Sequence, residues 1–381
     1  MKVGYLAGVV LVAVATGCAP ATTPVSKKGY QGQPPIGEPI VFADYPLLTV
    51  GGATSGWRWI PFPDSTCGNG STTGLAIDLG TTDDLLVFFD GGGACWNWAT
   101  CNPLEATAVD RGFDEAKFIT EARDFIPSSL TSRAHLPTAL MGATIVFIPY
   151  CTGDVHGGDN VRTYSYLVDS VTWRHKGHAN VLAFLKRLGA TFPAPRKLVV
   201  AGSSAGGFGA LVNYEAFRWY WPDAQGYLID DSGPALVNND VPADFRQGWF
   251  DAWRLGVATD PFCLDCRTNL SSAFTELADM HRDDRIAFVS HTQDKVMGPF
   301  MLSTGSLFEA DLRQLERDVL RPTANVRAFY ELLDDHMMLT PLTPLGTADY
   351  TASHVTGTTG LDAWLQAMLD DQPWDSVLPP P

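Results

Sequence analysis

A serine flanked by small residues lies near the middle of the chain, between a strand-like and a helix-like segment. Ser204 occupies the third position of the motif G-x-S-x-G, between Gly202 and Gly206. The apolar run 197–201 predicts a strand before the motif, and the apolar spacing of 207–217 predicts a helix after it. A strand, this motif and a helix form the nucleophile elbow of α/β-hydrolases, a sharp turn that exposes the serine hydroxyl. The sequence therefore predicts a serine nucleophile; the alternative is a glycine-rich turn without chemistry.

A second glycine-rich segment begins at Asp90, directly after the strand-like run 85–89. It reads D-G-G-G-A-C-W, and α/β-hydrolases carry an oxyanion donor in a loop at this point of the fold. Glycines let backbone N–H groups approach a developing negative charge without obstruction by side chains. We therefore expect the amides of Gly92 and Gly93, with the amide of Ala205, to form an oxyanion hole. The alternative is a flexible turn. A phosphate-binding loop is excluded because no Gly-Lys-Ser/Thr follows.

Four segments, taken in chain order, carry a family resemblance. They are DGGGACW at 90–96, YCTGDVH at 150–156, AGSSAGG at 201–207 and DSGP at 231–234. Together they resemble the pectin acetylesterase and Notum family, over about residues 50–340. The resemblance implies a secreted α/β-hydrolase that cleaves carboxylic esters with a Ser-Asp-His triad and without a metal or other cofactor. The chain looks like a bacterial lipoprotein-type member.

The substrate is not identified by this resemblance. The substrates known for the wider family, acetylated pectin and a protein-linked fatty acyl ester, differ too much from each other. We expect a small ester or an acylated carbohydrate, hydrolysed through an acyl-enzyme. The alternatives are a hydrolase or transferase of longer acyl chains, and a non-catalytic binding lipoprotein that kept the fold.

The acid of the triad is expected after a strand that follows the serine in the chain. The run 286–290 predicts a strand, and Asp294 comes four residues after it. The resemblance also places an acid at the end of this strand. Asp294 would hold the histidine in its correct tautomer and stabilise the imidazolium. Asp230 and Asp231, after the preceding strand-like run, are rival acids, or they cap the turn at the D-S-G-P corner.

The histidine of the triad is expected late in the chain, after the acid. Among eight histidines, His336 lies directly after the strand-like run 326–333, and the resemblance implies a histidine at this place. His354, on a later polar loop, is the second choice, and His291 lies close in sequence to Asp294. We predict that His336 accepts the hydroxyl proton when the serine attacks an ester carbonyl.

Residues near these motifs are candidates for the walls of a substrate pocket. Three tryptophans are able to stack on sugar rings, although tryptophans in a large fold belong more often to the core: Trp96, Trp98 and Trp173. Trp96 and His156 are the pocket residues that we single out. Asp154, His156 and Asp159 have the residue types of a metal site. A loop whose acids bond to turn amides is the favoured interpretation, and we expect no metal.

The start of the chain has the composition of a targeting segment followed by a tether. A positive start and the apolar run 3–15 are typical of a secretory signal, and the run is too short to span a membrane. Cys18 follows a small residue, which resembles a bacterial lipoprotein cleavage site with lipid attached to this cysteine. The alternative is cleavage near Ala21 and release. We expect a signal peptide over 1–18, a flexible tether over 19–39 and a catalytic domain over 40–381.

Six cysteines remain beyond Cys18, and an even number in an exported chain favours disulfides. Two pairs are suggested by short spacing and the third by elimination: Cys95–Cys101, Cys263–Cys266 and Cys67–Cys151. The C-x-x-C of the second pair is also compatible with zinc ligands or a redox pair. A loop disulfide is favoured because the chain has no second C-x-x-C.

The chain has 381 residues, of which 45% are hydrophobic, and a formal net charge of −16. This acidic balance argues against a nucleic-acid partner, and we expect membrane contact only through a lipid on Cys18. Short apolar runs alternate with helical patterns, and no repeat or linker divides the body. The pattern predicts an α/β fold with a mostly parallel sheet flanked by helices. The expected strands are 74–79, 85–89, 144–148, 197–201, 226–230, 286–290 and 326–333, and the expected helices include 178–188, 206–219, 311–320 and 361–369.

Overall fold

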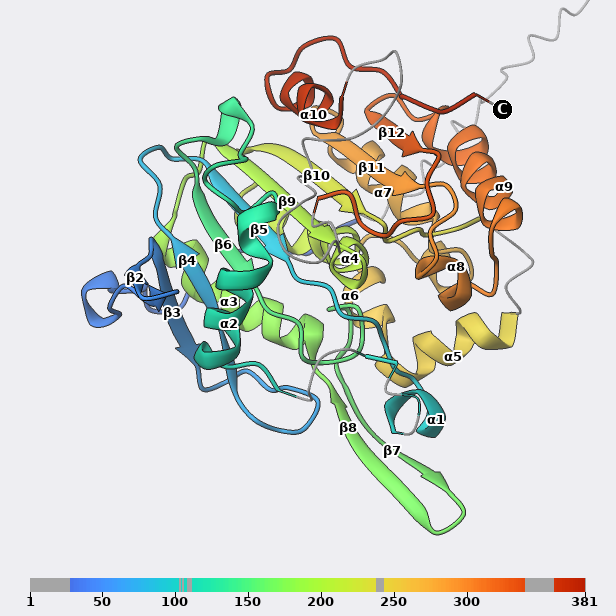
Figure 1. Ribbon diagram of the computed structural model, residues 1–381, viewed down its shortest axis with the longest axis horizontal. Helices are drawn as coiled ribbons and strands as arrows, with labels where there is room; N and C mark the ends of the chain where they lie inside the picture. The colour runs from blue at the N-terminus through green and yellow to red at the C-terminus, as the bar shows by residue number, and fades with distance from the viewer. Residues whose placement is uncertain are drawn as a thin grey trace, which may run out of the picture.

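The computed structural model describes residues 28–102, 104, 106–107, 112–237, 243–339 and 360–380. Its centre is an eight-stranded sheet (Figure 1). In spatial order the strands are β12 (Val326–Glu331), β11 (Arg285–His291), β10 (Gln225–Asp231), β9 (Lys197–Ser203), β5 (Leu85–Phe89), β6 (Thr144–Ile148), β4 (Thr73–Asp78) and β3 (Trp57–Phe62). The strands from β12 to β6 pair in parallel, whereas β4 pairs antiparallel with both β6 and β3. This mostly parallel sheet with flanking helices confirms the α/β-hydrolase fold.

Helices cover both faces of the sheet (Figure 1). They are α1 (Trp98–Cys101), α2 (Glu115–Asp124), α3 (Gly177–Thr191), α4 (Ala205–Tyr220), α5 (Ala243–Trp253), α6 (Gly256–Thr259), α7 (Ser272–Met280), α8 (Met297–Phe300), α9 (Ser306–Leu315) and α10 (Leu361–Leu369). A π-helical turn (Glu316–Leu320) continues α9. The helix expected over 311–320 therefore begins five residues earlier than predicted. Its hydrogen bonds change from the α-helical to the π-helical pattern over Glu316–Leu320.

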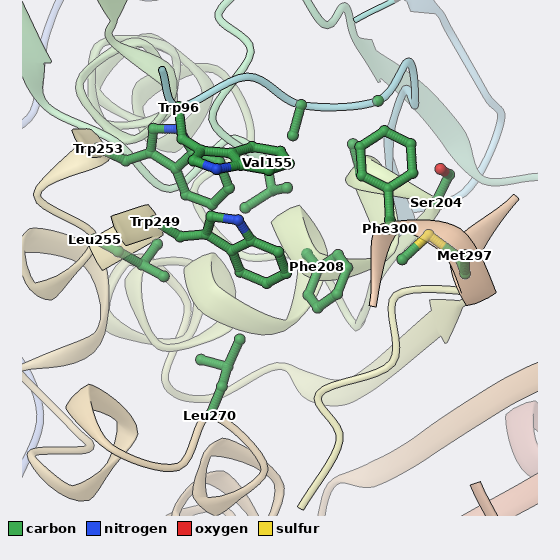
Figure 2. Close-up of a pocket in the computed structure, with 13 residues that line it drawn as sticks. Trp96, Val155, Ser204, Phe208, Trp249, Trp253, Leu255, Leu270, Met297 and Phe300 are labelled. Carbon is green, nitrogen blue, oxygen red and sulfur yellow. The ribbon is translucent and has the colours of Figure 1, made fainter. Parts of the chain in front are cut away.

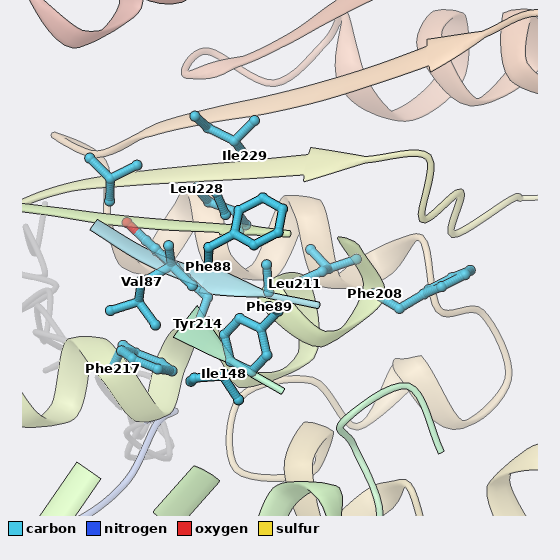
Figure 3. Close-up of a cluster of buried hydrophobic side chains, with 14 of the residues drawn as sticks. Val87, Phe88, Phe89, Ile148, Phe208, Leu211, Tyr214, Phe217, Leu228 and Ile229 are labelled. Carbon is cyan, nitrogen blue, oxygen red and sulfur yellow. The ribbon is translucent and has the colours of Figure 1, made fainter. Parts of the chain in front are cut away.

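Alternate residues of β5 show how the core is divided between the two faces. Phe89 packs against Phe217 of α4, with ring centroids 5.8 Å apart (Figure 3). Phe88 points to the opposite face, where it lies beside Phe147, and Phe147 packs against Phe118 of α2. Every residue of β5 is buried, as expected for a parallel strand that is covered on both faces.

The strand order creates a natural binding edge beside β5. From β5 the chain continues to β6 on one side and later to β9 on the other, so the order reverses there. The register pairs Phe89 with Gly202, and Asp231 with Ser203, which aligns the carboxyl ends of β5, β9 and β10. Ligands of open α/β sheets bind in the crevice outside the carboxyl ends at such a reversal. We therefore expect the candidate site at this edge of the sheet.

Two small ribbons lie outside the main sheet, and neither was expected. Strands β7 (Asn160–Tyr166) and β8 (Asp169–His175) form an antiparallel ribbon that projects from the body (Figure 1). A shorter ribbon pairs β1 (Thr49–Val50) with β2 (Ala53–Thr54). Most residues of these strands are exposed or half-buried, so their sequences lack the apolar alternation that marks a strand facing a core.

The segment before the sheet lies against the body over residues 28–39. Tyr30 stacks on Trp219, with ring centroids 4.8 Å apart, and the Gly29 amide donates to the carbonyl of Pro261. The tether expected to extend to residue 39 is therefore bound to the domain from residue 28 onward. The expected signal peptide and Cys18 lie outside the described residues. No helix in the described part of the chain combines the length and the apolar character needed to cross a membrane.

Three disulfides fasten loops around the sheet. They join Cys67 to Cys151, Cys95 to Cys101 and Cys263 to Cys266, which are the three pairs expected. The first connects the loop after β3 with the loop after β6, across 84 residues of sequence. The second closes a loop directly after the glycine-rich segment that follows β5. The edge of the sheet that carries the candidate site is thus cross-linked at two points.

Candidate active site

Ser204 lies on a strained turn between β9 and α4. Its backbone angle φ is +58°, a value that residues other than glycine rarely adopt and that is typical of the nucleophile elbow. The turn needs glycine on both sides, since a Cβ on Gly202 would lie 2.2 Å from the carbonyl oxygen of Gly206. A Cβ on Gly206 would lie 2.1 Å from the carbonyl oxygen of Phe89. The amide of Ser204 donates to the carbonyl of Asp231 at 2.7 Å, which holds the turn against β10.

The glycine-rich loop after β5 runs directly beside this turn. A Cβ on Gly91 would meet the carbonyl oxygen of Ser203 at 2.7 Å, so the two backbones are in close contact. Gly92 and Gly93 have φ values of +143° and +74°, which turn this stretch of backbone sharply. Among the described hydrogen bonds, none uses the amide of Gly92, Gly93 or Ala205. Each of these three residues lines a cavity that Ser204 also lines.

His336 and Asp294 form a close buried pair on the loops that follow β12 and β11. The Nδ1 atom of His336 lies 2.6 Å from Asp294 Oδ2, and both side chains are buried. The other carboxylate oxygen, Oδ1, accepts hydrogen bonds from the amides of Val296 and Met297, each at 2.8 Å. These two amides hold the carboxylate in orientation. Because a carboxylate accepts, Nδ1 carries the proton and Nε2 is left as the basic nitrogen.

Ser204 and His336 line the same cavity at the edge of the sheet. Their side chains form no direct hydrogen bond in this structure. Catalytic hydrogen bonds are often long before substrate binds and shorten in the complex. The arrangement thus brings to one cavity a serine hydroxyl on a strained turn and an imidazole bonded to a buried carboxylate.

The rival acids and histidines occupy other positions. Asp231 contacts no histidine, and its carboxylate accepts bonds from two backbone amides and two hydroxyls. Asp230 accepts one bond, from the amide of Gly233 at the D-S-G-P corner. His291 lies beside Glu331, with Nδ1 and Oε2 3.7 Å apart. The remaining alternative, His354, lies outside the described residues.

An apolar cavity extends from Ser204 (Figure 2). Aromatic and aliphatic side chains from α4, α5, α8 and the loop after β5 form its walls. The principal ones are Trp96, Phe208, Trp249, Trp253, Met297 and Phe300. Leu255 and Leu270 lie at the end away from Ser204 in Figure 2. Apart from Ser204, every side chain that lines this cavity is apolar, so it suits a hydrocarbon group.

A second, larger cavity shares Ser204, Gly93 and Phe300 with the apolar cavity. Its lining includes His336 and the ionisable residues Asp90, Lys117 and Glu121. Removal from water raises the pKa of the Asp90 carboxyl to about 8, and the nearby Glu121 adds to this effect. The serine hydroxyl therefore stands between an apolar space and a more polar one.

Several residues singled out from the sequence lie behind the site and do not line it. His156 lines neither cavity, and its Nε2 is 2.8 Å from the carbonyl oxygen of Asp90, beneath the glycine-rich loop. Trp173 is buried and donates to the carbonyl of Thr152. Trp98 stacks on Tyr166 of the β7–β8 ribbon. Of the pocket residues expected from the sequence, only Trp96 contributes to a cavity wall.

The acids near His156 also have partners of their own. Asp154 accepts hydrogen bonds from the hydroxyl of Thr152 and the amide of Gly177. Asp159 forms an ion pair with Lys176 at 2.6 Å. These contacts place the two carboxylates in turn and surface interactions. The metal interpretation of this segment therefore has no support in the geometry.

Two tryptophans of α5 were not anticipated as site residues. Trp249 and Trp253 are four residues apart, so they lie on one face of the helix and both reach the apolar cavity. Their spacing in the sequence predicts that both lie on one face of a helix. An apolar helix face normally packs into the core of a protein. Only the placement of α5 over the edge of the sheet makes it a cavity wall.

Comparisons with known proteins agree with this geometry. The family model for pectinacetylesterase matches residues 62–284, a little over half of the chain. The chain is 29% identical over 222 residues to palmitoleoyl-protein carboxylesterase notum1' of Xenopus laevis, which covers 55% of this chain and 39% of the relative. It is 27% identical over 186 residues to palmitoleoyl-protein carboxylesterase NOTUM of Homo sapiens, which covers 45% of this chain and 35% of the relative.

A third relative is palmitoleoyl-protein carboxylesterase NOTUM of Schmidtea mediterranea, which is 25% identical over 174 residues, or 41% of this chain and 30% of the relative. The chain thus spans less than half of the length of the curated relatives that it matches. The matched residues include most of the sheet and Ser204. Asp294 and His336 follow them in the chain. The chain belongs to the pectinacetylesterase family of carboxylic ester hydrolases.

Proposed function

We propose that this protein is a serine esterase that hydrolyses carboxylic esters through an acyl-enzyme. Ser204 is the nucleophile, His336 the general base and Asp294 the acid that orients it. The observation that carries this proposal is the His336–Asp294 pair, which shares a cavity with a serine on a strained turn. Family membership supports the reaction class.

The mechanism follows from the positions of these groups. Nε2 of His336 takes the hydroxyl proton while Ser204 attacks the ester carbonyl, and the resulting imidazolium is stabilised by Asp294. The carbonyl oxygen becomes negative and accepts hydrogen bonds from Ala205 and from Gly92 or Gly93. His336 then returns the proton to the leaving alcohol. Water, activated by the same imidazole, releases the acid and restores the serine.

The apolar cavity favours acyl chains longer than acetyl. An acetyl group places a single methyl beyond the carbonyl and would occupy only the part of the cavity nearest Ser204. The aromatic walls and the leucines at the far end offer contact to several further methylene groups, each worth about 0.8 kcal/mol when buried. The names of the Notum relatives, which specify a palmitoleoyl group, agree with this preference. Deacetylation of a carbohydrate is the second candidate, and the more polar cavity would then receive the sugar.

The first test replaces the proposed nucleophile and base. Ser204→Ala and His336→Ala should each lower kcat on p-nitrophenyl esters by a factor on the order of 10⁴–10⁶, because they remove groups that act as a unit. His291→Gln serves as the histidine control and should retain most of the activity. Near-normal turnover by purified Ser204→Ala would refute the assignment.

A fluorophosphonate probe and an ester series separate the remaining alternatives. Labelling of the wild type, and its loss in Ser204→Ala, identifies an activated serine, whereas a non-catalytic binding protein would not be labelled. Among acetate, butyrate and octanoate esters of p-nitrophenol, we expect kcat/KM to rise beyond acetate. A maximum at acetate, together with release of acetate from acetylated polysaccharides, would favour the carbohydrate deacetylase.

We further propose that the protein is exported and then either lipidated on Cys18 or released. Three disulfides are consistent with an oxidising compartment. Cell fractionation of the wild type and of Cys18→Ser tests the anchor. Retention of the wild type in the membrane fraction and release of Cys18→Ser would support lipidation, whereas release of both proteins would favour simple secretion.

A further inference from the structure

Asp231 has an unusual concentration of hydrogen bonds for a carboxylate that contacts no cation. It is fully buried at the end of β10. The amides of Met338 and Leu339 donate to it at 2.9 and 2.8 Å. The hydroxyls of Ser203 and Ser232 donate to it at 2.7 and 3.0 Å. Four donors from three separate segments therefore converge on one side chain.

These contacts join the two halves of the proposed catalytic machinery. Met338 and Leu339 follow His336 by two and three residues, so they hold the loop that carries the base. Ser203 immediately precedes Ser204, and the backbone carbonyl of Asp231 accepts the Ser204 amide at 2.7 Å. One residue thus binds the nucleophile turn through its carbonyl and the base loop through its carboxylate.

The strand order explains why such a connection is needed. His336 follows β12, which is separated from β9 by β11 and β10. Three strand spacings amount to about 14 Å, so the loop after β12 must turn back across two strands to reach Ser204. Asp231 ends the strand that lies next to β9 on that path. The loop changes direction at Met337, which has a φ of +59°, and is bound to Asp231 immediately afterwards.

We propose that Asp231 is a positioning residue that sets the distance between the Ser204 hydroxyl and the His336 imidazole. It contacts neither the imidazole nor the cavity that receives substrate, and it transfers no proton. The inference rests on the proposed function, because it concerns the same serine and histidine. It assigns a role to a carboxylate that the proposed chemistry does not use.

The neighbouring Asp230 provides a matched control. It is buried on the same strand, but it accepts a single hydrogen bond, from Gly233, and none from the loop that carries His336. Burial raises its pKa well above the usual range of a carboxyl, with the nearby Asp231 adding to the effect. Asparagine resembles a protonated carboxyl in shape and charge, so Asp230→Asn should change little. Asp231→Asn instead replaces an accepting oxygen with a donating NH₂ group. The groups around it, two backbone amides and two hydroxyls, already donate.

The experiment compares Asp231→Asn with Asp230→Asn on the full chain. A displacement of about 1 Å between reacting groups costs on the order of 10²-fold in rate. We expect Asp231→Asn to lower kcat by about 10- to 100-fold per folded molecule, with KM changed less than about threefold. The second-order rate of fluorophosphonate labelling should fall by the same factor. Asp230→Asn should stay within about threefold of the wild type in all three quantities.

Active-site titration normalises each preparation to its folded fraction, which separates positioning from simple loss of stability. Wild-type kcat and labelling rate per titrated site in Asp231→Asn would overturn the inference, and so would a loss that appears only in KM. If Asp231→Asn is insoluble, Ser203→Ala removes one of the four donors and should lower kcat several-fold; an unchanged kcat would count against the inference. Absence of turnover in the wild type itself would instead refute the proposed function.

Discussion

Two buried aspartates near the edge of the sheet differ in what their carboxylates contact, and this difference separates their roles. Asp294 places one oxygen 2.6 Å from the His336 ring and fixes the other oxygen with two amides. Asp231 accepts only from amides and hydroxyls. Both were plausible triad acids by position in the sequence. Contact with the imidazole favours Asp294 for the proposed role, because a carboxylate bonded to Nδ1 selects the tautomer of the ring.

At this scale we predict the effect of removing the orienting charge. Asp294→Asn should lower kcat by a factor on the order of 10⁴, because an amide donating to Nδ1 favours the tautomer that leaves Nε2 protonated. Steady-state kinetics on a p-nitrophenyl ester measures this change. Asp334→Asn, on the same loop as His336 but without a contact to it, is the control. A loss of less than tenfold in Asp294→Asn would argue against the assignment of this acid.

The apolar cavity is a property of elements and not of single residues. Its walls come from α4, α5 and α8 together with the loop after β5, segments that are distant in the sequence. Apolar side chains from each of these helices line the same cavity. The cavity length is therefore set by side chains at its far end, among them Leu270 on the loop before α7.

We predict that a larger side chain at this end shortens the preferred acyl chain. Leu270→Trp should lower kcat/KM for the octanoate ester at least tenfold relative to acetate, since misfit of one or more methylenes costs about 1–3 kcal/mol. The ratio of the two kcat/KM values is the measurement. Leu264→Trp is the matched control, because Leu264 is 69% exposed and lies outside the cavity. An unchanged ratio in Leu270→Trp would show that the acyl chain does not occupy this cavity.

At the scale of the whole molecule, buried histidines away from the triad couple folding to pH. Burial lowers the pKa of His156 to about 4 and that of His175 to about 3. Burial also lowers the pKa of His178. Each ring is neutral in the folded protein at a pH where the unfolded chain binds a proton. The contribution of these rings to stability is complete above the unfolded pKa near 6.5 and is lost as pH falls below it.

We predict the sign of this linkage for His175, which contacts Tyr164 and Thr152. His175→Gln removes the titrating group. Between pH 7.5 and 4.5, the free energy of unfolding of the variant should therefore rise by about 3 kcal/mol relative to that of the wild type. Urea unfolding at the two pH values gives both free energies. A difference that is independent of pH would mean that His175 titrates equally in the folded and unfolded states.

Elements with strong local patterns were readable from the sequence. The buried strands β5 and β6 were placed at their observed bounds, because parallel strands covered on both faces are continuous apolar runs. The residues predicted for the elbow and for the glycine-rich loop could also be named, because each segment is a short glycine-rich motif directly after an apolar, strand-like run. The exposed ribbon β7–β8 was missed because little apolar alternation marks it in the sequence. The start of α9 was missed although Phe308 belongs to the same apolar face as Leu312 and Leu315.

The fold class, the family and the chain order of the candidate serine, acid and histidine could all be derived from sequence patterns. Folding was needed to show which aspartate lies against His336, which carboxylate binds the loop that carries it, and which side chains line the apolar cavity. The two groups of features differ in the separation along the chain of the residues that specify them. Turns and buried strands depend on neighbouring residues, whereas the site depends on loops from four strands whose spacing is set only by the assembled sheet.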